Sequence, residues 1–440
     1  MSRAGPSGVT TDWTNWAGNQ HATSAEVLVP STVEEVAAAV RAAASAGRRV
    51  KPVGSGHSFT DIARAEDQRL DLSRLDGLVS VDRKRRLATV QAGMRLHTLN
   101  RVLAAHGLAL PNLGDIDRQT ISGAISTGTH GTGAAFGCLA TFVEELTLIT
   151  ASGETLRCSA TENPDVFAAA RVGLGALGVI VEVTLRCVDA FVLHADERPA
   201  SLAAVLADLD EHVAGNDHFE FYWFPYTDRV QVKANNRAPT NHRPLSRFRG
   251  WLDDEFLSNT VFGGACRLGR AVPALVPAIS AVSARALTAR TYTAASHEVF
   301  CTPRRVRFVE MEYALPRAAL PEALAALPRI IDALPFKVLF PVEVRFAAPD
   351  DIWLSHGYGR ESAYVAIHQY VGMPYEPYFR EFEKVAQALD GRPHWGKLHY
   401  RDAESLRPAY PRFVDFLALR DRLDPDRVFA NAYTDRVLGS

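Results

Sequence analysis

Residues 50–61 read VKPVGSGHSFTD, and the rest of the chain is organised around this stretch. The apolar run VKPV is typical of the end of a β-strand, and Gly54 and Gly56 then let the backbone turn with a positive φ. A strand that enters such a turn forms a nest of backbone N–H groups that suits a phosphate. His57 follows the second glycine. By spacing alone, a tight turn with an exposed histidine is the more frequent outcome, because short glycine motifs also arise by chance.

The spacing of these glycines differs from both common nucleotide-binding motifs. No Gly-Lys-Ser/Thr follows, as a P-loop requires, and the third glycine of the Rossmann pattern G-x-G-x-x-G is absent. Upstream, residues 26–30 (EVLVP) predict a strand, and residues 31–34 (STVE) predict a capping box at the start of a helix that ends at Gly47. This strand–helix–strand unit and its glycine turn predict an α+β arrangement able to hold a nucleotide.

A second glycine-rich stretch, ISGAISTGTHGTGAAFG, occupies residues 121–137. Small residues at this density cannot build a core, but they let the backbone pass close to a bulky, flat group or to another backbone. Strands are predicted at 143–150 and 154–160 with a hairpin at 151–153, and a longer β-branched strand ends near residue 188. We therefore expect the first structural unit to close between residues 188 and 195.

Residues from about 196 to 390 predict a second domain. A helix is expected at 200–213, and strands are expected in FEFYWFP, RVQVKAN, RFVEMEYAL, KVLFPVEVRFA and AYVAIHQY. The apolar stretch 272–287 predicts a helix that covers a core, because arginines interrupt its surroundings and it is too short to span a membrane. A last helix and a tail are expected from Pro411 onward.

Composition limits the classes of function. The chain has 440 residues, of which 47% are hydrophobic, enough for more than one core, and its formal net charge is −2. This balance lacks the basic footprint of a protein that binds nucleic acid or anionic membranes, so small molecules are the expected partners. Five scattered cysteines without C-x-x-C spacing argue against a disulfide framework or a metal site and favour a reducing compartment. With no apolar secretory segment at the start, a cytoplasmic location and no membrane span are expected.

Two local patterns contain candidate catalytic groups. In KVLFPVEVRFA, Glu343 and Arg345 are two residues apart on a strand and therefore share one face. Two alternatives stay open for them: a buried structural ion pair, or a pair that binds and polarises a hydroxyl. In GRPHWGK, Lys397 is placed to stabilise a developing alkoxide, although a surface loop with a packed Trp fits equally well. Taken singly, His130 and His368 fit satisfied core histidines.

Five motifs together carry a resemblance to a known family. They run in order from about residue 12 to the C-terminus: VGSGHSFTDIA, ISGAISTGTHGTG, VEVRF, GRPHWGK and RLDPDRVFANAY. On these motifs the chain resembles the aldonolactone oxidoreductases of the vanillyl-alcohol-oxidase-type flavoproteins. Within that group it is most similar to the L-gulono-1,4-lactone oxidases and dehydrogenases. No single motif is specific, but the set of five is.

The resemblance implies a fold and a cofactor. The implied fold is α+β, with a two-subdomain FAD-binding unit (12–190), a cap domain with a large antiparallel sheet (191–400) and a C-terminal segment (401–440) that returns to the FAD unit. The histidine of the G-x-G-H-S motif corresponds to His57, which would be bonded covalently to the 8-methyl carbon of FAD. The other residues expected at the FAD are Gly54, Ser55, Gly56, Ser58, Gly114, Ser122, Gly128, Thr129, Thr132, Gly133, Ile180 and His394.

The resemblance also implies the reaction. The C2 hydroxyl of a sugar 1,4-lactone, L-gulono-1,4-lactone or a close stereoisomer, would be oxidised by hydride transfer to flavin N5, and the product would enolise to an ascorbate-type compound. Glu343 would accept the hydroxyl proton, while Arg345 and Lys397 stabilise the developing oxyanion. Oxygen or another acceptor would reoxidise the flavin. Gly114 leaves a path for oxygen where some dehydrogenase relatives carry alanine.

Two other functions stay open at this point. Alditol oxidases, which act on a primary alcohol of a polyol, share two of the motifs, but a serine that contacts the polyol in them corresponds to Ala124 here. The third alternative is a flavin-free binding protein that keeps the fold. Bleaching of the flavin by a lactone but not by xylitol or sorbitol would separate the first two, and a colourless protein would favour the third.

Overall fold

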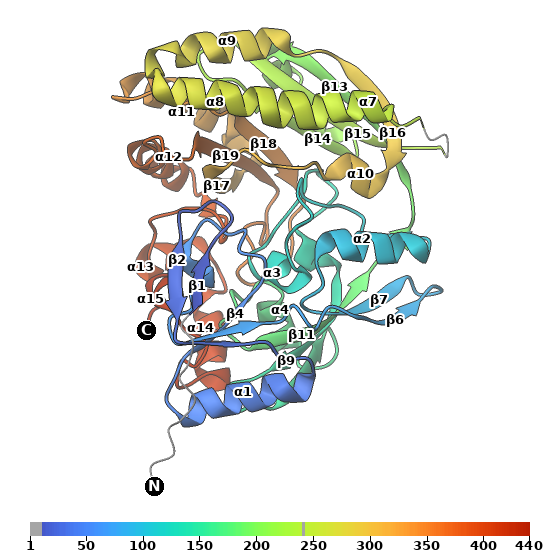
Figure 1. The fold of residues 1–440 in the computed structure, drawn as a ribbon, viewed down its shortest axis with the longest axis vertical. Helices are drawn as coiled ribbons and strands as arrows, with labels where there is room; N and C mark the ends of the chain where they lie inside the picture. The colour runs from blue at the N-terminus through green and yellow to red at the C-terminus, as the bar shows by residue number, and fades with distance from the viewer. Residues whose placement is uncertain (1–10, 240–242) are drawn as a thin grey trace.

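The computed structural model describes residues 11–239 and 243–440. Figure 1 shows two halves stacked along the long axis of the molecule. The lower half contains the N-terminal elements and the C-terminal helices, whereas the upper half, the cap, is built from the middle of the chain. A separate large hydrophobic cluster fills each half. Each half therefore has a core of its own, although Phe59 of the lower half joins the core of the cap and stacks on Phe308.

A small parallel sheet begins the lower half. It is formed by β3 (Glu26–Leu28), β5 (Gln68–Asp71) and β4 (Val50–Val53) in that spatial order. Helix α1 (Val33–Ser45) links β3 to β4, and the Thr32 hydroxyl caps it by accepting the N–H of Glu35. The predicted strand–helix–strand unit is confirmed, but the helix is capped one residue later than the sequence pattern predicted.

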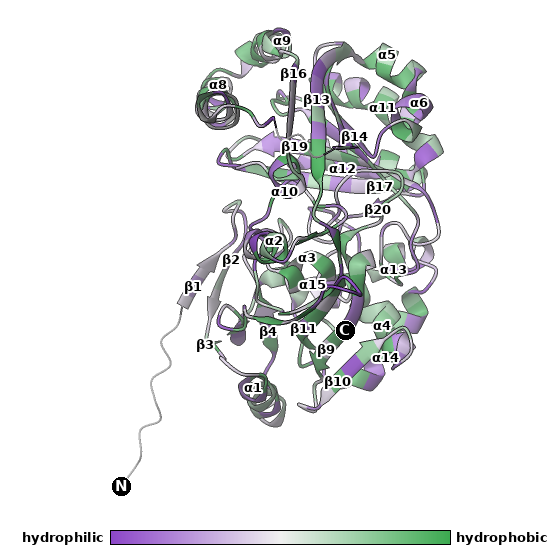
Figure 2. Cartoon of the chain, turned by 90° about the vertical axis from the view of Figure 1, so that its right-hand side faces the viewer, coloured by the Kyte–Doolittle hydropathy of each residue, from purple (hydrophilic) through white to green (hydrophobic). Residues whose placement is uncertain are grey.

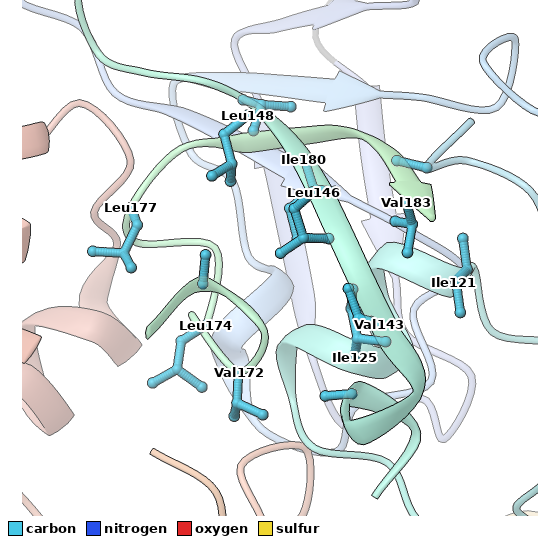
Figure 3. Close-up of a cluster of buried hydrophobic side chains, with 14 of the residues drawn as sticks. Ile121, Ile125, Val143, Leu146, Leu148, Val172, Leu174, Leu177, Ile180 and Val183 are labelled. Atoms are coloured by element: carbon cyan, nitrogen blue, oxygen red, sulfur yellow. The ribbon is translucent and has the colours of Figure 1, made fainter. Parts of the chain in front are cut away.

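A second, antiparallel sheet supplies most of the lower core, with five strands in the order β10-β9-β11-β7-β6. The predicted hairpin at 151–153 is confirmed, because β9 and β10 pair on either side of it. Figure 3 shows the isoleucines of α3 among valine and leucine side chains of this sheet. The elements are β6 (Leu78–Asp82), β7 (Leu87–Gln91), β9 (Val143–Ile149), β10 (Thr155–Ser159), β11 (Val179–Arg186), α2 (Leu96–Ala105), α3 (Ile121–Ser126) and α4 (Pro164–Ala170).

The C-terminal segment packs against the lower half. Phe413 and Phe416 of α14 and Tyr433 of α15 belong to the lower hydrophobic cluster. The sequence predicted one helix and a tail, but the tail contains a further helix, α15, because the Asn431 side chain caps it by accepting the N–H of Thr434. The remaining lower elements are β1 (Thr11–Thr14), β2 (His21–Ser24), β8 (Leu108–Ala109), β12 (Val188–Asp189), α13 (Ala403–Leu406), α14 (Phe413–Leu423) and α15 (Ala432–Leu438).

The cap is built on one antiparallel sheet of eight strands, in the order β16-β13-β15-β14-β18-β19-β17-β20. The predicted large antiparallel sheet is confirmed, and its five predicted strands correspond to β14, β15, β17, β18 and β19. Three strands were not predicted. The strands are β13 (Val192–Ser201), β14 (His218–Trp223), β15 (Arg229–Ala238), β16 (Arg290–Ala295), β17 (Phe308–Pro316), β18 (Val342–Ala347), β19 (Ser362–Tyr370) and β20 (Arg392–Pro393).

Helices flank this sheet. In Figure 2, α5, α6 and α11 lie to the right of strands β13 and β16, and α8 and α9 lie to the left. The predicted helix at 200–213 is wrong in part: β13 continues to Ser201, and the helix is interrupted at Asp208. The helical elements are α5 (Leu202–Ala207), α6 (Leu209–Ala214), α7 (Arg247–Gly250), the π-helical segment η3 (Trp251–Val261), α8 (Phe262–Ala271), α9 (Val276–Ala286), α10 (Ser296–Phe300), α11 (Leu320–Ala333) and α12 (Glu376–Ala388).

The long apolar stretch 272–287 forms α9, which covers part of the cap core as the sequence predicted. Within the described ranges, none of the helices has both the length and the apolar character needed to cross a membrane.

Candidate active site

Two cavities adjoin each other between the halves. The first, of about 590 Å³, lies under the cap sheet, and the second, of about 490 Å³, lies within the lower half. His57, Ser58, Gln119 and Thr127 line both, so the two cavities meet at the turn that follows β4. A ligand that fills both cavities would therefore pass directly by His57.

The glycine turn is built to approach a ligand closely. The backbone N–H groups of residues 55–58 donate to no described atom of the protein, and neither does the buried hydroxyl of Ser55. Gly56 has a φ of +68°, and a Cβ added at Gly54 would lie 2.4 Å from the Thr120 hydroxyl oxygen. Four free amides and an unpartnered buried hydroxyl make an anion site, which fits the pyrophosphate of FAD.

His57 is held at the junction of the cavities. The Trp16 ring stacks on the imidazole with ring centroids 5.7 Å apart, and the backbone N–H of Trp16 donates to the Gly56 carbonyl at 2.8 Å. Burial lowers the pKa of His57 to about 4, and the nearby Lys397 ammonium contributes in the same direction. The ring is therefore neutral at pH 7 and keeps a nitrogen lone pair available. The exposed histidine that spacing alone favoured is not what the fold provides.

Most of the residues predicted at the FAD line one of the two cavities. Three of them do not. Gly128, with a φ of +74°, lies against His356, and Gly133 donates its N–H to the Phe346 carbonyl of the cap sheet at 2.8 Å. Thr132 binds the same sheet through its hydroxyl, which accepts the Phe346 N–H at 3.2 Å. The second cavity contains Gly54, Ser55, Gly56, Ser122 and Ile180, and the first contains Gly114, Thr129 and His394.

Ala124 does not lie where a substrate contact would need it. Its side chain is fully buried in the lower hydrophobic cluster, and it lines neither cavity. The contrast with the alditol oxidases at this position therefore says nothing about the substrate of this chain.

Side chains alternate across the central strands of the cap sheet, as the pleat requires. The face under α11 and α12 is apolar, whereas the face over the first cavity carries ionisable groups. The apolar set is Phe219, Phe221, Trp223, Val309, Met311, Tyr313, Val342, Val344, Phe346, Val365 and Ile367. The polar set on the cavity side is Tyr222, Glu310, Glu312, Glu343, Arg345 and His368.

Glu343 and Arg345 share the cavity face, as predicted, and form an ion pair. The Tyr222 hydroxyl donates to Oε1 of Glu343 at 2.6 Å, the same oxygen that Arg345 contacts. Nε of Arg345 also binds Glu220 at 3.0 Å, on the neighbouring strand. The first alternative from the sequence, a buried ion pair, is confirmed. Because the pair also faces the cavity, the second, a pair that binds and polarises a hydroxyl, stays a prediction.

Two further ionic clusters lie at the cavity, and the first of them joins the lower half to the cap. Asp115, beside Gly114 in the lower half, lies 3.5 Å from Arg345 and 3.0 Å from Arg304 of the cap. Lys397 pairs with Glu310 of β17, and His368 lies 3.6 Å from the same carboxylate. The GRPHWGK loop is not a surface loop, because residues 391–396 are all buried. The loop instead places Lys397 at the cavity.

Glu343 differs electrostatically from the other carboxyls around this cavity. Burial raises the pKa of Glu343, and the Asp115 and Glu220 carboxylates add to that effect against the attraction of Arg345. For Asp115, Glu220 and Glu310, burial acts in the same direction, but nearby arginine or lysine cations hold each pKa below its ordinary value. The contact with His130 and the charge of Lys397 likewise lower the pKa of Glu312 against the effect of burial. Lys397 is affected in two opposite ways. Burial lowers its pKa, but the carboxylates of Glu310 and Glu312 raise that pKa above its ordinary value. The cavity therefore combines a carboxylate suited to accept a proton with a fixed cation.

One group of side chains has the composition of a metal site. Donor atoms of His130, Glu312 and His394 all lie within 4.8 Å of one another. However, Nδ1 of His394 accepts the Gly396 N–H at 3.0 Å, so a neutral His394 carries its proton on Nε2. Nδ1 of His130 is 2.8 Å from the Gly131 carbonyl, and Nε2 is 3.2 Å from Glu312. Nδ1 of His394 and both nitrogens of His130 therefore already have contacts within the protein.

Several residues of this site were missed or misjudged from the sequence. Tyr222, Glu310 and Glu312 repeat the pattern that identified Glu343 and Arg345: polar residues two apart in an otherwise apolar strand. That signal was present and was overlooked. Glu220, two residues before Tyr222, shares that pattern. Asp115, Arg304 and His368 carried no comparable local signal, because they join the site only through tertiary contacts.

Comparison with known proteins supplies the context for this geometry. Residues 183–437 match the family described as D-arabinono-1,4-lactone oxidase, and residues 24–159 match an FAD binding domain. The chain is 44% identical to L-gulono-1,4-lactone dehydrogenase of Mycobacterium tuberculosis over 97% of this chain and 99% of that protein. It is 36% identical to L-gulonolactone oxidase of Bos taurus and 35% identical to alditol oxidase of a Streptomyces species, in each case over 96% of this chain and 97% of the relative.

Among solved structures, cholesterol oxidase from Brevibacterium sterolicum superposes with a TM-score of 0.81 at 18% identity, covering 98% of this chain and 97% of that chain. At this identity the likeness concerns the fold alone.

Proposed function

Because this chain belongs to the D-arabinono-1,4-lactone oxidase family and is an FAD-dependent oxidoreductase, we propose that it oxidises the C2 hydroxyl of a sugar 1,4-lactone. The family and the cofactor predicted from the sequence are confirmed. L-gulono-1,4-lactone or a close stereoisomer is the proposed substrate, since it appears in the names of relatives that match over nearly the whole chain. The proposed product is a 2-keto lactone that enolises to an ascorbate-type compound.

FAD would lie along the two adjoining cavities. Its pyrophosphate would be held by the free amides of residues 55–58 and by the Ser55 hydroxyl, and Ser122 and Ile180 would line the same cavity. Bound FAD supplies the acceptor for the hydride that leaves the carbon bearing the hydroxyl. The protein supplies binding, orientation and the removal of the proton.

Glu343 is the proposed proton acceptor. A raised pKa suits a general base, because a carboxylate that holds its proton more strongly is a better base. Its Oε1 is engaged by Tyr222 and Arg345, which leaves Oε2 to accept the proton of the C2 hydroxyl. A cavity-facing carboxylate with one oxygen held by Tyr222 and Arg345 and the other left free is the observation that carries the proposal.

Arg345 and Lys397 are the proposed stabilisers of the oxygen from which the proton leaves. Both are cations that line the first cavity, and the carboxylates beside them hold them in place. Charge that develops on the substrate oxygen would meet two preorganised positive groups in a buried site. Oxygen or another acceptor would close the cycle. Gly114 lines the first cavity without a side chain, which supports access by oxygen.

The test is anaerobic reduction of the flavin. Holoenzyme is mixed with L-gulono-1,4-lactone, with its stereoisomers or with xylitol, and bleaching of the flavin is followed in time. The proposal expects rapid bleaching by a lactone, slow or no bleaching by xylitol, and a large loss of the lactone rate in Glu343→Gln. Bleaching by xylitol but not by any lactone would contradict the proposal and support a polyol oxidase, the activity named for one of the relatives.

A further inference from the structure

The cap carries an unusually apolar outer surface. Of the thirteen large hydrophobic side chains that are exposed in the described part of the chain, nine lie between residues 248 and 282. Three examples are Phe248 (70% exposed), Trp251 (53%) and Val282 (64%). We call this set the cap helix surface: Phe248, Trp251, Phe256, Leu257, Val261, Leu268, Val272, Leu275 and Val282.

These helices are anchored, so the exposure is a property of the folded cap. Helix α8 buries Gly263, Cys266 and Gly269, and α9 buries Val276 and Ala284. Figure 1 shows α8 and α9 side by side across the top of the molecule, at the end farthest from α1. The helices therefore contact the cap through small residues and a few apolar ones such as Val276 and Phe262, while the nine side chains of the cap helix surface stay exposed.

The same segment is locally basic, although the whole chain has a net charge of −2. Residues 243–290 contain seven arginines against three acidic residues, and no acidic residue occurs from Phe256 to His297. Arg267, Arg270 and Arg285 are exposed and form no ion pair with the described residues. The three acidic residues, at 253–255, are confined to one turn of η3. The overall composition hid this patch, because acidic residues elsewhere balance it.

We propose that the cap helix surface docks onto an anionic phospholipid bilayer, with α8 and α9 lying in the plane of the membrane. Exposed aromatic and aliphatic side chains would enter the boundary between headgroups and acyl chains, and the arginines would contact lipid phosphates. A second copy of this chain fits the surface poorly, because a two-fold interface would bring the same arginines face to face. The described helices do not span a membrane, so the attachment is peripheral.

Docking in this way would also affect the active site. Phe262, the first residue of α8, lines the first cavity. Asn259 of η3 binds the cavity segment next to it, with its side-chain amide donating to the Pro303 carbonyl at 3.1 Å and its amide oxygen accepting the Arg305 N–H at 2.8 Å. The cap helix surface is thus continuous with one wall of the cavity, and docking would hold the cavity next to the bilayer.

The experiment is vesicle flotation with the full-length holoenzyme. Vesicles of phosphatidylcholine alone are compared with vesicles that also contain phosphatidylglycerol, at low and high salt. The proposal expects binding to the anionic vesicles that weakens as salt is raised. Two double variants should each lower the bound fraction at least several-fold. One is Phe248→Ser/Trp251→Ser, and the other is Arg267→Glu/Arg270→Glu. The matched control, Val79→Ser with Val414→Ser, removes exposed apolar residues far from this surface and should bind as the wild type does.

Each outcome is decisive once flavin content and thermal midpoint show that the variants are folded. No binding to anionic vesicles at low salt would overturn the proposal, and so would equal loss of binding in the control. The proposal would also be overturned if binding did not depend on lipid charge and was unchanged in the double variant Arg267→Glu/Arg270→Glu. Light scattering gives the alternative outcome. If the wild type is a dimer that does not bind vesicles, and the double variant Phe248→Ser/Trp251→Ser is a monomer, the surface binds a second copy of the chain. These readouts do not depend on lactone oxidation, so failure of the proposed function would leave them intact.

Discussion

The Tyr222 hydroxyl lies 2.6 Å from Oε1 of Glu343, and the two residues are direct partners in the pairing of β14 with β18. Because Arg345 contacts the same oxygen, Tyr222 helps to fix the carboxylate with Oε2 free. Tyr222→Phe should therefore lower the rate of flavin reduction by lactone about ten- to a hundredfold, which corresponds to a lost hydrogen bond to a charged group of about 1.5–3 kcal/mol. Flavin content should stay unchanged.

The control for this prediction is Tyr378→Phe. Tyr378 is fully buried, but its hydroxyl has no hydrogen-bond partner among the described residues and lines neither cavity. Its removal should leave the reduction rate within about twofold of the wild type. If Tyr222→Phe reduces the flavin as fast as Tyr378→Phe does, Tyr222 has no role in positioning Glu343.

The second prediction concerns the pH dependence of reduction. The base must be ionised to accept a proton, so the rate should rise with pH through the raised pKa of Glu343 and then level off. Glu343→Gln should remove this rising limb and lower the rate by about 10²- to 10⁴-fold. The measurement is anaerobic stopped-flow reduction by lactone over a pH series. Glu383→Gln alters a buried carboxyl that accepts the Tyr313 hydroxyl at 2.6 Å outside both cavities, and it should keep the limb.

The sequence predicted best those parts of the site that are local. His57 lies in a glycine turn, Glu343 and Arg345 are two residues apart on one strand, and Lys397 ends a short loop, so a few neighbouring residues identify each of them. Tyr222 reaches Glu343 only because β14 and β18 pair in one register, and 121 residues separate the two in the chain. Register depends on the packing of the whole sheet, which no short pattern contains.

Errors in the predicted fold have the same origin. The helix expected at 200–213 begins late because β13 gains its hydrogen bonds from β15 and β16, which lie well downstream in the sequence. The pairing of distant strands overrides local helix preference there. Gly128, Thr132 and Gly133 matched an FAD-binding pattern, but in the fold they pack against His356 and the cap sheet. A small residue in a motif shows that something comes close, not what it is.

The third prediction concerns His57. Its neutral ring at the junction of the cavities is suited to attack an activated flavin methyl group, so we expect a covalent bond to FAD. After acid precipitation, the yellow colour should stay with the wild-type protein, and the peptide that contains His57 should carry an FAD-sized mass. His57→Ala should release its flavin to the supernatant. His97→Ala, which changes a histidine that lines only the second cavity, should retain it. Free flavin from the wild type would contradict the bond.

The last prediction uses Lys51, a buried lysine in the strand that leads into the glycine turn. Its ammonium donates to the Phe429 carbonyl at 3.1 Å, and no carboxylate of the described chain pairs with it. Burial lowers the pKa of Lys51 from 10.5 to about 7, and Arg420 contributes. Between these two values the unfolded chain binds more protons than the folded chain, so stability should rise with pH across this window and be independent of Lys51 below it.

Lys51→Met should remove this dependence. At neutral pH the folded protein bears most of the penalty for burying the charge, up to about 5 kcal/mol for a shift of this size, so the variant should be more stable there. The wild type should recover the difference as the pH approaches the ordinary pKa of lysine. The measurement is the free energy of urea unfolding at both ends of the pH window between the folded and unfolded pKa values of Lys51. Wild type and Lys51→Met are compared with a control, Lys84→Met, which changes an exposed lysine. A slope with pH that Lys51→Met shares with Lys84→Met would show that other groups cause the dependence, because Lys51 is buried without a carboxylate partner whereas Lys84 is exposed.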